Sequence, residues 1–490
     1  MEQNSRTFKV LALSFGQTLV SISSILSTMV AARVLTKLDY ATFKQTFLAY
    51  NFAAPILLLG LPNAVYYFLP KEVKNKRGVL VDNLVLILIS ASLFSLFLFL
   101  GGDSLLARRF NNPDLEETLS WMKFYPIYVM PASVISAVLL TQNKTNLLVA
   151  YNVITSILLT FSVMGAVYIT KGYELPLKIQ IFLPLTFLPI GLYFCFNHTP
   201  GWFRLPDFIQ MKAMVAYAVP LGLASILSMI MLETNKIIVS WMGTPEEFAT
   251  YVNGAIEIPL IGIITGSIAS VILVDMTKSV QEGKLEDALK LFHTAAIRSA
   301  SILFPVTIFL LIAAKPFIIT LFSEKYIESI VPFYIFTSLL PIRIVVYGSA
   351  LMALGYSKVI LIRSFFDLLI NSLLSILFVS LIGFLGAAIA TFITIYLWTV
   401  PFNLYKISKG FNVSIKKTLP FHDLRKIFVF SLMFSPIGLI QEFLSIRPEI
   451  MFIGLFLVYF FSTFAILYKK SFLVLPTRVE NNLPQFLRNK

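Results

Sequence analysis

The chain has 490 residues, of which 57% are hydrophobic and only 13% are charged, about half the charged share of an average soluble protein. A mean hydropathy of +0.83 excludes a soluble globular protein, because a chain of this size cannot hide so much apolar surface without a bilayer as solvent. The residues that give the formal net charge of +14 must lie mainly on surfaces that face water.

Residues that carry metal or thiol chemistry are scarce. Cys195 is the single cysteine, and the three histidines, His198, His293 and His422, are scattered through polar connections. The chain also lacks the glycine-rich phosphate loop of an ATPase. We therefore expect no metal site, no cofactor and no catalytic residues.

Apolar runs long enough to cross a bilayer occur about fourteen times. A helix rises about 1.5 Å per residue, so each run can cross a hydrocarbon core of about 30 Å, and the runs are too long for barrel strands. The first run follows Met1–Lys9, which carries no signal-peptide cleavage pattern, so we expect it to be retained. The predicted spans are 10–33, 43–68, 79–101, 118–141, 146–169, 175–196, 213–242, 248–275, 296–318, 328–354, 359–381, 384–404, 426–444 and 449–468.

Lysine and arginine residues predict the orientation. With a cytoplasmic N-terminus, the inner loops hold more than twice as many of them as the outer loops, so both termini are expected in the cytoplasm. The positive charge then faces anionic lipid, and nucleic acid is not an expected partner. The few basic residues assigned to outer loops include Lys37, Lys44, Arg108 and Arg109.

A five-residue pattern occurs twice, as DYATF at Asp39–Phe43 and as EFATY at Glu247–Tyr251. Similar five-residue stretches precede both copies, SSILS at Ser23–Ser27 and ASILS at Ala224–Ser228. Six predicted spans separate the copies, so both begin on the same side of the membrane, as in parallel transporter repeats. Chance similarity between apolar helices is the alternative explanation.

The repeat predicts a division of the chain into six parts. These are an N-terminal six-helix bundle at 1–196, a cytoplasmic linker at 197–212, a second six-helix bundle at 213–405, a basic cytoplasmic loop at 406–425, a helix pair at 426–468 and a basic cytoplasmic tail at 469–490.

Ionisable residues inside predicted spans are candidates for a functional cavity, because burying a charge in lipid is costly. Arg343 lies more than ten residues from either end of its span, and Glu257 lies about ten residues, or roughly 15 Å, into its span. Arg33 and Lys236 occupy matching places near the outer ends of two spans, where snorkelling to the surface is the alternative.

Other charged residues within the spans have more ordinary explanations. Arg363 and Asp367 are four residues apart, which predicts an ion pair on one helix face. Asp275 and Arg298 lie near the cytoplasmic interface and are expected to anchor their helices.

Long stretches of the chain resemble the Wzx-type polysaccharide flippases of the multidrug/oligosaccharidyl-lipid/polysaccharide exporter superfamily. These stretches include AARVLTKLDYATFKQTF at Ala31–Phe47, LLLGLPNAVYYFLPK at Leu57–Lys71 and ETNKIIVSWMGTPEEFATYVNGAIEIPL at Glu233–Leu260. The sequence departs from the family at Ala41 and Ala249, where the family usually carries glycine.

The resemblance implies an all-α fold like that of MATE and MurJ proteins, with two parallel six-helix bundles and a C-terminal helix pair. It also implies a flippase in the bacterial inner membrane that works by alternating access. The cargo would be a polyprenyl-diphosphate-linked oligosaccharide, such as an O-antigen unit of lipopolysaccharide or another surface polysaccharide unit. The implied partners are this lipid-linked glycan, the lipid bilayer and the polysaccharide polymerase machinery.

A cavity with more cations than acids suits a diphosphate, because arginine presents a planar fork to phosphate oxygens. We therefore expect Arg343, Arg33 and Lys236 to bind the substrate. Glu257 and Glu233 are the candidates for binding a coupling cation. Glu233 stands two residues before Asn235-Lys236, where the family often has an acid followed by a base.

Two other functions remain open. A MATE-like, cation-coupled exporter of small organic molecules would need an acid in the N-terminal bundle, where Asp82 is the only one inside a span. A membrane enzyme of polysaccharide assembly generally needs a large extramembrane loop. The longest predicted outer loop, Gly101–Thr118, has under twenty residues, so an enzyme is not expected.

Overall fold

A computed structural model describes residues 2–444 and 446–472, so most of the predicted basic tail lies outside the described residues. All regular elements in these two ranges are helices. Eleven helical stretches are long and apolar enough to cross a membrane, which confirms an all-α polytopic membrane protein. The predicted spans at 213–242, 248–275 and 426–444 are not among the eleven, so the count of about fourteen stays a prediction.

The helices form two compact units. Unit 1 comprises Met1–Ala249 with Val379–Phe384, and unit 2 comprises Thr250–Phe378 with Leu385–Lys490. The division reflects which residues pack against each other. It places the helix after the predicted linker, Phe208–Met242, in unit 1. The bundle boundaries predicted from the repeat remain a prediction.

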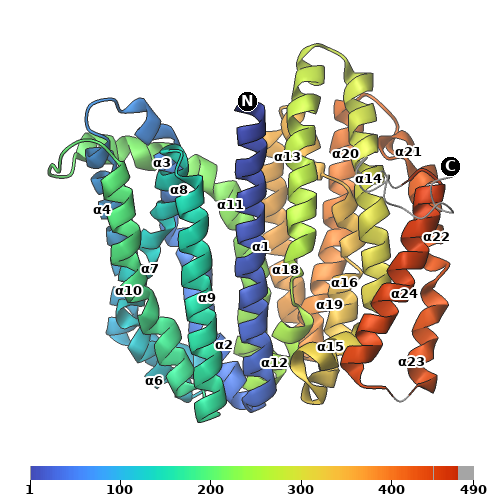
Figure 1. Cartoon of the computed structure of the whole chain (residues 1–490), viewed down its shortest axis with the longest axis horizontal. Helices are drawn as coiled ribbons and strands as arrows, with labels where there is room; N and C mark the ends of the chain where they lie inside the picture. Colours follow the sequence, from blue (N-terminus) through green and yellow to red (C-terminus); the bar gives the residue numbers. More distant parts are fainter. Residues whose placement is uncertain (1, 445, 473–490) are drawn as a thin grey trace. The chain divides into compact units, whose positions relative to one another are not determined.

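Among the described residues, unit 1 contains the eleven α-helices α1 to α11 and three short helical elements of other types. In this unit α1 packs along α9, and α11 packs against α2 and α3 (Figure 1). The elements are α1 (Glu2–Val34), α2 (Lys37–Leu58), α3 (Leu61–Lys71), α4 (Lys76–Phe97), η1 (Leu98–Gly102), α5 (Asp103–Arg109), α6 (Asp114–Trp121), η2 (Met122–Phe124), α7 (Tyr125–Val129), η3 (Met130–Ala132), α8 (Ser133–Thr141), α9 (Thr145–Thr170), α10 (Glu174–His198) and α11 (Phe208–Met242).

Unit 2 is built around α14, which packs against α13, α22 and the short helix η5. The element α12 (Pro245–Gly254) leads into this unit. The others are α13 (Pro259–Gln281), α14 (Leu285–Ile312), α15 (Ala314–Phe322), η4 (Glu324–Ser329), α16 (Ile330–Thr337), η5 (Leu340–Ile344), α17 (Tyr347–Ala353), α18 (Ser357–Ile382), α19 (Leu385–Ile393), η6 (Thr394–Thr399), α20 (Val400–Gly410), α21 (Ile415–Thr418), α22 (Phe421–Leu432), η7 (Ser435–Leu439), α23 (Ile440–Phe443) and α24 (Pro448–Lys469).

The repeated five-residue pattern starts a helix in both copies, after a corner of two residues. Thr36 precedes α2, and its Oγ1 accepts a hydrogen bond of 3.0 Å from the backbone N–H of Asp39. Thr244 precedes α12, where its Oγ1 accepts from the N–H of Glu247 at 3.2 Å and its own N–H donates to Glu247 Oε2 at 2.8 Å. Both corners therefore use a threonine cap, and the second is a complete capping box.

The second predicted span is broken in its middle, between α2 and α3. Leu59 and Gly60 have φ values of 45° and 74°, a left-handed conformation that costs little only for glycine. Asn83 Nδ2 of α4 donates a hydrogen bond of 2.9 Å to the carbonyl of Leu61 just after the break. A Cβ atom on Gly222 of α11 would lie 2.8 Å from the carbonyl atoms of Leu59, so the break packs backbone against backbone.

Candidate functional site: ion pairs at helix breaks

The structure places Glu257 in a break between two helices, so the prediction of a continuous span over 248–275 is wrong at this point. Helix α12 ends at Gly254, and α13 begins at Pro259. Proline favours the first position of a helix because it needs no backbone N–H partner there. The four residues between the helices leave Glu257 on irregular backbone.

Arg343 also lies where a predicted span is interrupted. The run predicted as one helix over 328–354 is divided into α16, η5 and α17. Arg343 is in the last turn of η5, and Val345 that follows has an extended conformation with ψ of 120°. Arg343 therefore lies in a short 3-10 helix, and the continuous helix expected around it is interrupted.

The two breaks bring Glu257 and Arg343 together in unit 2. Arg343 Nη2 lies 3.7 Å from Glu257 Oε1, which is an ion-pair distance and is too long for a hydrogen bond. The side chains are 46% and 61% exposed, respectively. Irregular backbone and exposed charge at membrane depth are tolerated where they face a water-filled cavity, and transporter folds commonly place binding sites at such broken helices.

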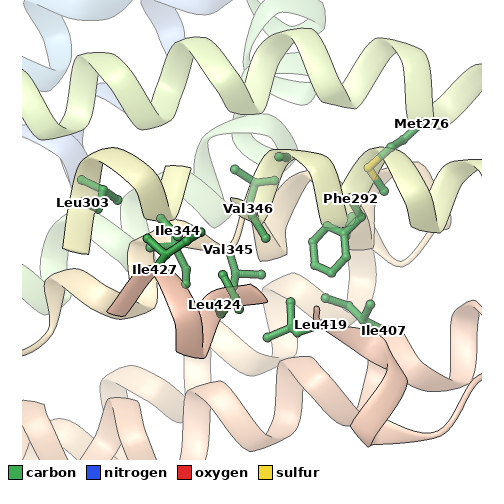
Figure 2. Packing of buried hydrophobic residues seen from close by; sticks show 14 of the residues in the cluster. Met276, Phe292, Leu303, Ile344, Val345, Val346, Ile407, Leu419, Leu424 and Ile427 are labelled. Atoms are coloured by element: carbon green, nitrogen blue, oxygen red, sulfur yellow. The ribbon is translucent and has the colours of Figure 1, made fainter. Parts of the chain in front are cut away.

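Apolar packing fixes the backbone that carries Arg343. The next three residues, Ile344, Val345 and Val346, are buried in the hydrophobic cluster of unit 2. Figure 2 shows them among side chains of α14 and α22, including Leu303 and Ile427. The side chain of Arg343 is therefore exposed next to a buried segment of backbone.

A second ion pair lies on α11 in unit 1. Lys236 Nζ donates a hydrogen bond of 2.8 Å to Glu233 Oε1, one turn earlier on the same helix. Both side chains are largely buried. In unit 1 and in unit 2, a basic residue expected to bind substrate is therefore paired with an acidic residue expected to bind a cation.

Lys44, which was counted among the basic residues of the outer loops, lies within a helix. Because α2 begins at Lys37, Lys44 lies two turns inside the helix. Its Nζ donates a hydrogen bond of 3.0 Å to Thr28 Oγ1 of α1, and the positive charge of Lys236 acts on it electrostatically. The polar run Lys44-Gln45-Thr46 in an otherwise apolar stretch was the signal that could have identified it.

Gln45 and Thr46 lie in a buried polar network beside Lys44. Gln45 Nε2 donates to Ser240 Oγ of α11 at 2.7 Å, and Asn112 Nδ2 donates to Gln45 Oε1 at 2.8 Å. Thr46 Oγ1 donates to Thr118 Oγ1 of α6 at 2.9 Å. The bond from Gln45 joins α2 to α11, and the other two join α2 to α6 and to the loop before it.

The structure places Arg33 in the last turn of α1, where it is half-buried. A cation at this position is favoured by the negative end of the helix dipole. Arg33 therefore has a structural explanation, and its predicted contact with substrate remains a proposal.

Arg363 and Asp367 form the predicted ion pair on α18, with 3.2 Å between Nε and Oδ2. The pair is largely buried, and Thr399 Oγ1 of η6 donates to Asp367 Oδ1 at 2.9 Å. Asn403 Oδ1 of α20 accepts from Arg363 at 3.2 Å. These contacts join α18 to η6 and α20, so the pair contributes to helix packing.

One protein family matches this chain in sequence. The family described as "Polysaccharide biosynthesis protein" matches residues 30–331. No curated protein matches the sequence significantly.

Solved structures resemble the chain over most of its length. The lipid II flippase MurJ, in an inward closed conformation, has a TM-score of 0.72 at 16% identity, covering 94% of this chain and all of MurJ. An inward-facing multidrug resistance MATE family transporter of the MOP superfamily has a TM-score of 0.63 at 15% identity, covering 83% and 99%. A MOP superfamily transporter from Pyrococcus furiosus, described as having a binding pocket of reverse polarity, has a TM-score of 0.55 at 14% identity, covering 82% and 94%.

At these identities the solved structures establish the fold, and the family match covers more than half of the sequence. The chain is a multi-pass membrane protein with the fold of MurJ and MATE transporters, and it belongs to the polysaccharide biosynthesis protein family.

Proposed function

We propose that this protein is a Wzx-type flippase that moves a polyprenyl-diphosphate-linked oligosaccharide across the bacterial inner membrane. An O-antigen unit or another surface polysaccharide unit is the proposed cargo. The observation that carries the proposal is the exposed ion pair between Arg343 and Glu257 at two helix breaks in unit 2. The family match supports a role in polysaccharide biosynthesis.

The pair can bind an anionic head group by exchange of partners. An exposed ion pair contributes only about 0–1 kcal/mol, so the guanidinium of Arg343 is released from Glu257 at low cost. A diphosphate can then bind the guanidinium of Arg343 through two parallel hydrogen bonds. This arrangement is stronger than the exposed ion pair. Glu257, freed from its partner, becomes available to bind a cation, and its return to Arg343 displaces the cargo.

Unit 1 offers a similar arrangement. Lys236 is paired with Glu233, and Lys44 lies close enough for the two ammonium groups to repel each other. An anion between the lysines would relieve that repulsion. We therefore include Lys44 with Lys236 and Arg33 among the substrate-binding residues, and Glu233 stays a candidate for cation coupling.

The proposed orientation has both termini in the cytoplasm, and the two predicted bundles carry out alternating access. A diphosphate with two net negative charges leaves an interior that is electrically negative. At about 100 mV this movement gains roughly 4–5 kcal/mol, equivalent to about a thousandfold accumulation. The membrane potential is therefore the proposed energy source, with cation binding at Glu257 or Glu233 as a further contribution.

The test is reconstitution of the purified protein in liposomes with a lipid-linked oligosaccharide and an imposed potassium-diffusion potential. We expect Arg343→Ala to abolish flipping while the protein still inserts, and Arg343→Lys to restore part of it. Arg298→Ala is the control, because Arg298 is an exposed arginine of α14. Normal flipping by Arg343→Ala, or flipping equally fast at every potential, would contradict the proposal.

Export of small organic cations is the second candidate function. The fold also matches MATE transporters, and Glu257 is an exposed carboxylate at a helix break. Transport of an organic cation that is lost in Glu257→Gln and retained in Arg343→Ala would favour this function. The same liposome assay distinguishes the two functions, because a flippase should lose transport in Arg343→Ala, whereas an exporter of organic cations should keep it.

A further inference from the structure

The linker between α10 and α11 exposes large apolar side chains. Trp202 and Phe203 are 59% and 65% exposed, and Leu205 is 88% exposed. Two residues at the start of α11 and one from the α3–α4 turn extend this surface. We call the whole set the linker patch: Val73, Trp202, Phe203, Leu205, Phe208 and Ile209.

Hydrogen bonds hold the linker firmly against the α3–α4 turn. Asn75 Oδ1 accepts from the backbone N–H of Trp202 at 3.0 Å and from that of Gly78 at 3.1 Å. Gly201 has φ of 120°, and a Cβ atom there would lie 2.4 Å from Asn75 Oδ1, so only glycine fits. The exposed side chains therefore project from a fixed backbone.

Arg77 adds a second attachment. Its Nε donates to the carbonyl of Thr199 at 2.9 Å, and its backbone N–H donates to that of Pro200 at 3.2 Å. The turn itself is ordered by Glu72, whose Oε1 accepts from the N–H groups of Asn75 and Lys74 and whose pKa is held below its usual range by these bonds.

Asp82 of α4 also attaches the linker. These contacts give a structural role to Asp82, which is the single acid inside a span of the predicted N-terminal bundle. Its carboxylate is buried and pairs with Arg204 Nη2 at 2.5 Å. The backbone N–H of Asp207 donates to Asp82 Oδ1 at 2.9 Å. Asp207 in turn caps α11 by accepting from the N–H of Ile209 at 2.9 Å.

Basic side chains surround the linker patch. Lys71, Lys74 and Lys212 are exposed, and Lys76 and Arg77 are partly exposed. The patch also lies where membrane-spanning stretches end, because α3 ends at Lys71, α4 begins at Lys76 and α10 ends at His198. Tryptophan and phenylalanine flanked by lysine and arginine at the ends of spans are typical of the membrane–water interface.

We propose that the linker patch lies in the head-group layer of the bilayer and binds anionic lipid. Its apolar side chains enter the acyl boundary, and the surrounding ammonium groups bind phosphate oxygens of the lipid head groups. Attachment through Asn75, Arg77 and Asp82 pairs several backbone groups of the linker, which lowers the cost of placing the patch in the interface.

The experiment uses the full chain with one tryptophan, Trp202, after Trp121, Trp241 and Trp398 are replaced by phenylalanine. The protein is reconstituted in phosphatidylcholine liposomes with or without phosphatidylglycerol. The lipids are brominated either near the glycerol backbone or near the chain ends. We expect a blue-shifted emission, loss of fluorescence that is greater with the shallow bromines, and a larger loss when phosphatidylglycerol is present.

The control is the same protein with Lys71→Gln, Lys74→Gln and Lys212→Gln, which keeps the attachment intact. It should lose the response to phosphatidylglycerol while Trp202 keeps its contact with lipid. Quenching of Trp202 by aqueous iodide without quenching by bromolipid, in both lipid compositions, would overturn the proposal and show that the patch faces water. This readout needs no transport, so it is independent of the proposed flippase function.

Discussion

Glu257 and Arg343 lie 3.7 Å apart, although they come from distant parts of the sequence and each occupies a helix break. The pair joins a residue expected to bind cargo to a residue expected to bind a cation. The proposed function makes Glu257 and the diphosphate of the cargo competitors for the guanidinium of Arg343. Such competition has measurable consequences for affinity and for coupling.

Glu257→Gln should increase the apparent affinity for the lipid-linked oligosaccharide. The amide removes the competing charge, and because an exposed ion pair contributes about 0–1 kcal/mol, the increase should reach at most about fivefold. The measurement is the KM for flipping in liposomes. Glu282→Gln is the control, since Glu282 is exposed and forms its ion pair with Lys284 outside the spans. An unchanged KM in Glu257→Gln would argue against competition.

Lys44→Met should reduce flipping and at the same time raise thermal stability. Lys44 is held between α1 and α2 within repelling distance of Lys236, and the methionine keeps its length without the charge. Flipping in liposomes and thermal unfolding in detergent are measured on the same preparations. Lys44→Arg should keep the flipping activity. If Lys44→Met loses stability together with flipping, the residue is structural.

Cysteine labelling in intact cells tests the orientation. Arg108→Cys should react with an impermeant reagent from outside, and Lys416→Cys should react only after permeabilisation, because both side chains are exposed. Asn112, in the same loop as Arg108, is buried by its bonds to Thr42 and Gln45 and is unsuitable. Cys195 is buried and is replaced by alanine in all variants. The reverse labelling pattern would refute the proposed topology.

Gly222→Ala should lower the thermal stability of the protein in detergent. The new Cβ would meet the backbone of Leu59 at 2.8 Å, and such overpacking typically costs about 1–3 kcal/mol. Gly165→Ala is the matched control in α9, since a Cβ there has no atom within 4 Å. The control should be neutral or slightly stabilising because alanine favours a helix. Equal unfolding temperatures for Gly222→Ala and the parent protein would show that the two backbones can separate at no cost.

Charged residues within apolar runs could be identified from the sequence, but their partners could not. Arg343 and Glu257 were identified because each lies far from the ends of an apolar run. Their contact depends on where two helices are interrupted, and Pro259 and Pro341 indicate a bend without fixing its direction. The local pairs Arg363–Asp367 and Glu233–Lys236 follow from helix spacing, which explains why the first was predicted correctly.

Lys44 shows how the position of a helix boundary changes the surroundings that are assigned to a charged residue. Hydropathy places the start of the second span at residue 43, whereas the Thr36 cap starts α2 at Lys37. Lys44 therefore lies two turns past the start of α2 in unit 1, and not at the start of a span. The cap was visible in the sequence as a threonine three residues before an acid, and it locates the boundary better than hydropathy does.

The two threonine-capped corners limit where foreign sequence can be added to the protein. Only Leu35 and Thr36 connect α1 to α2, and only Gly243 and Thr244 connect α11 to α12. An epitope tag or a fluorescent protein inserted at either corner would remove the cap and separate helices that reverse within two residues. The exposed stretch around Lys416, between α20 and α22, offers a longer connection for such insertions.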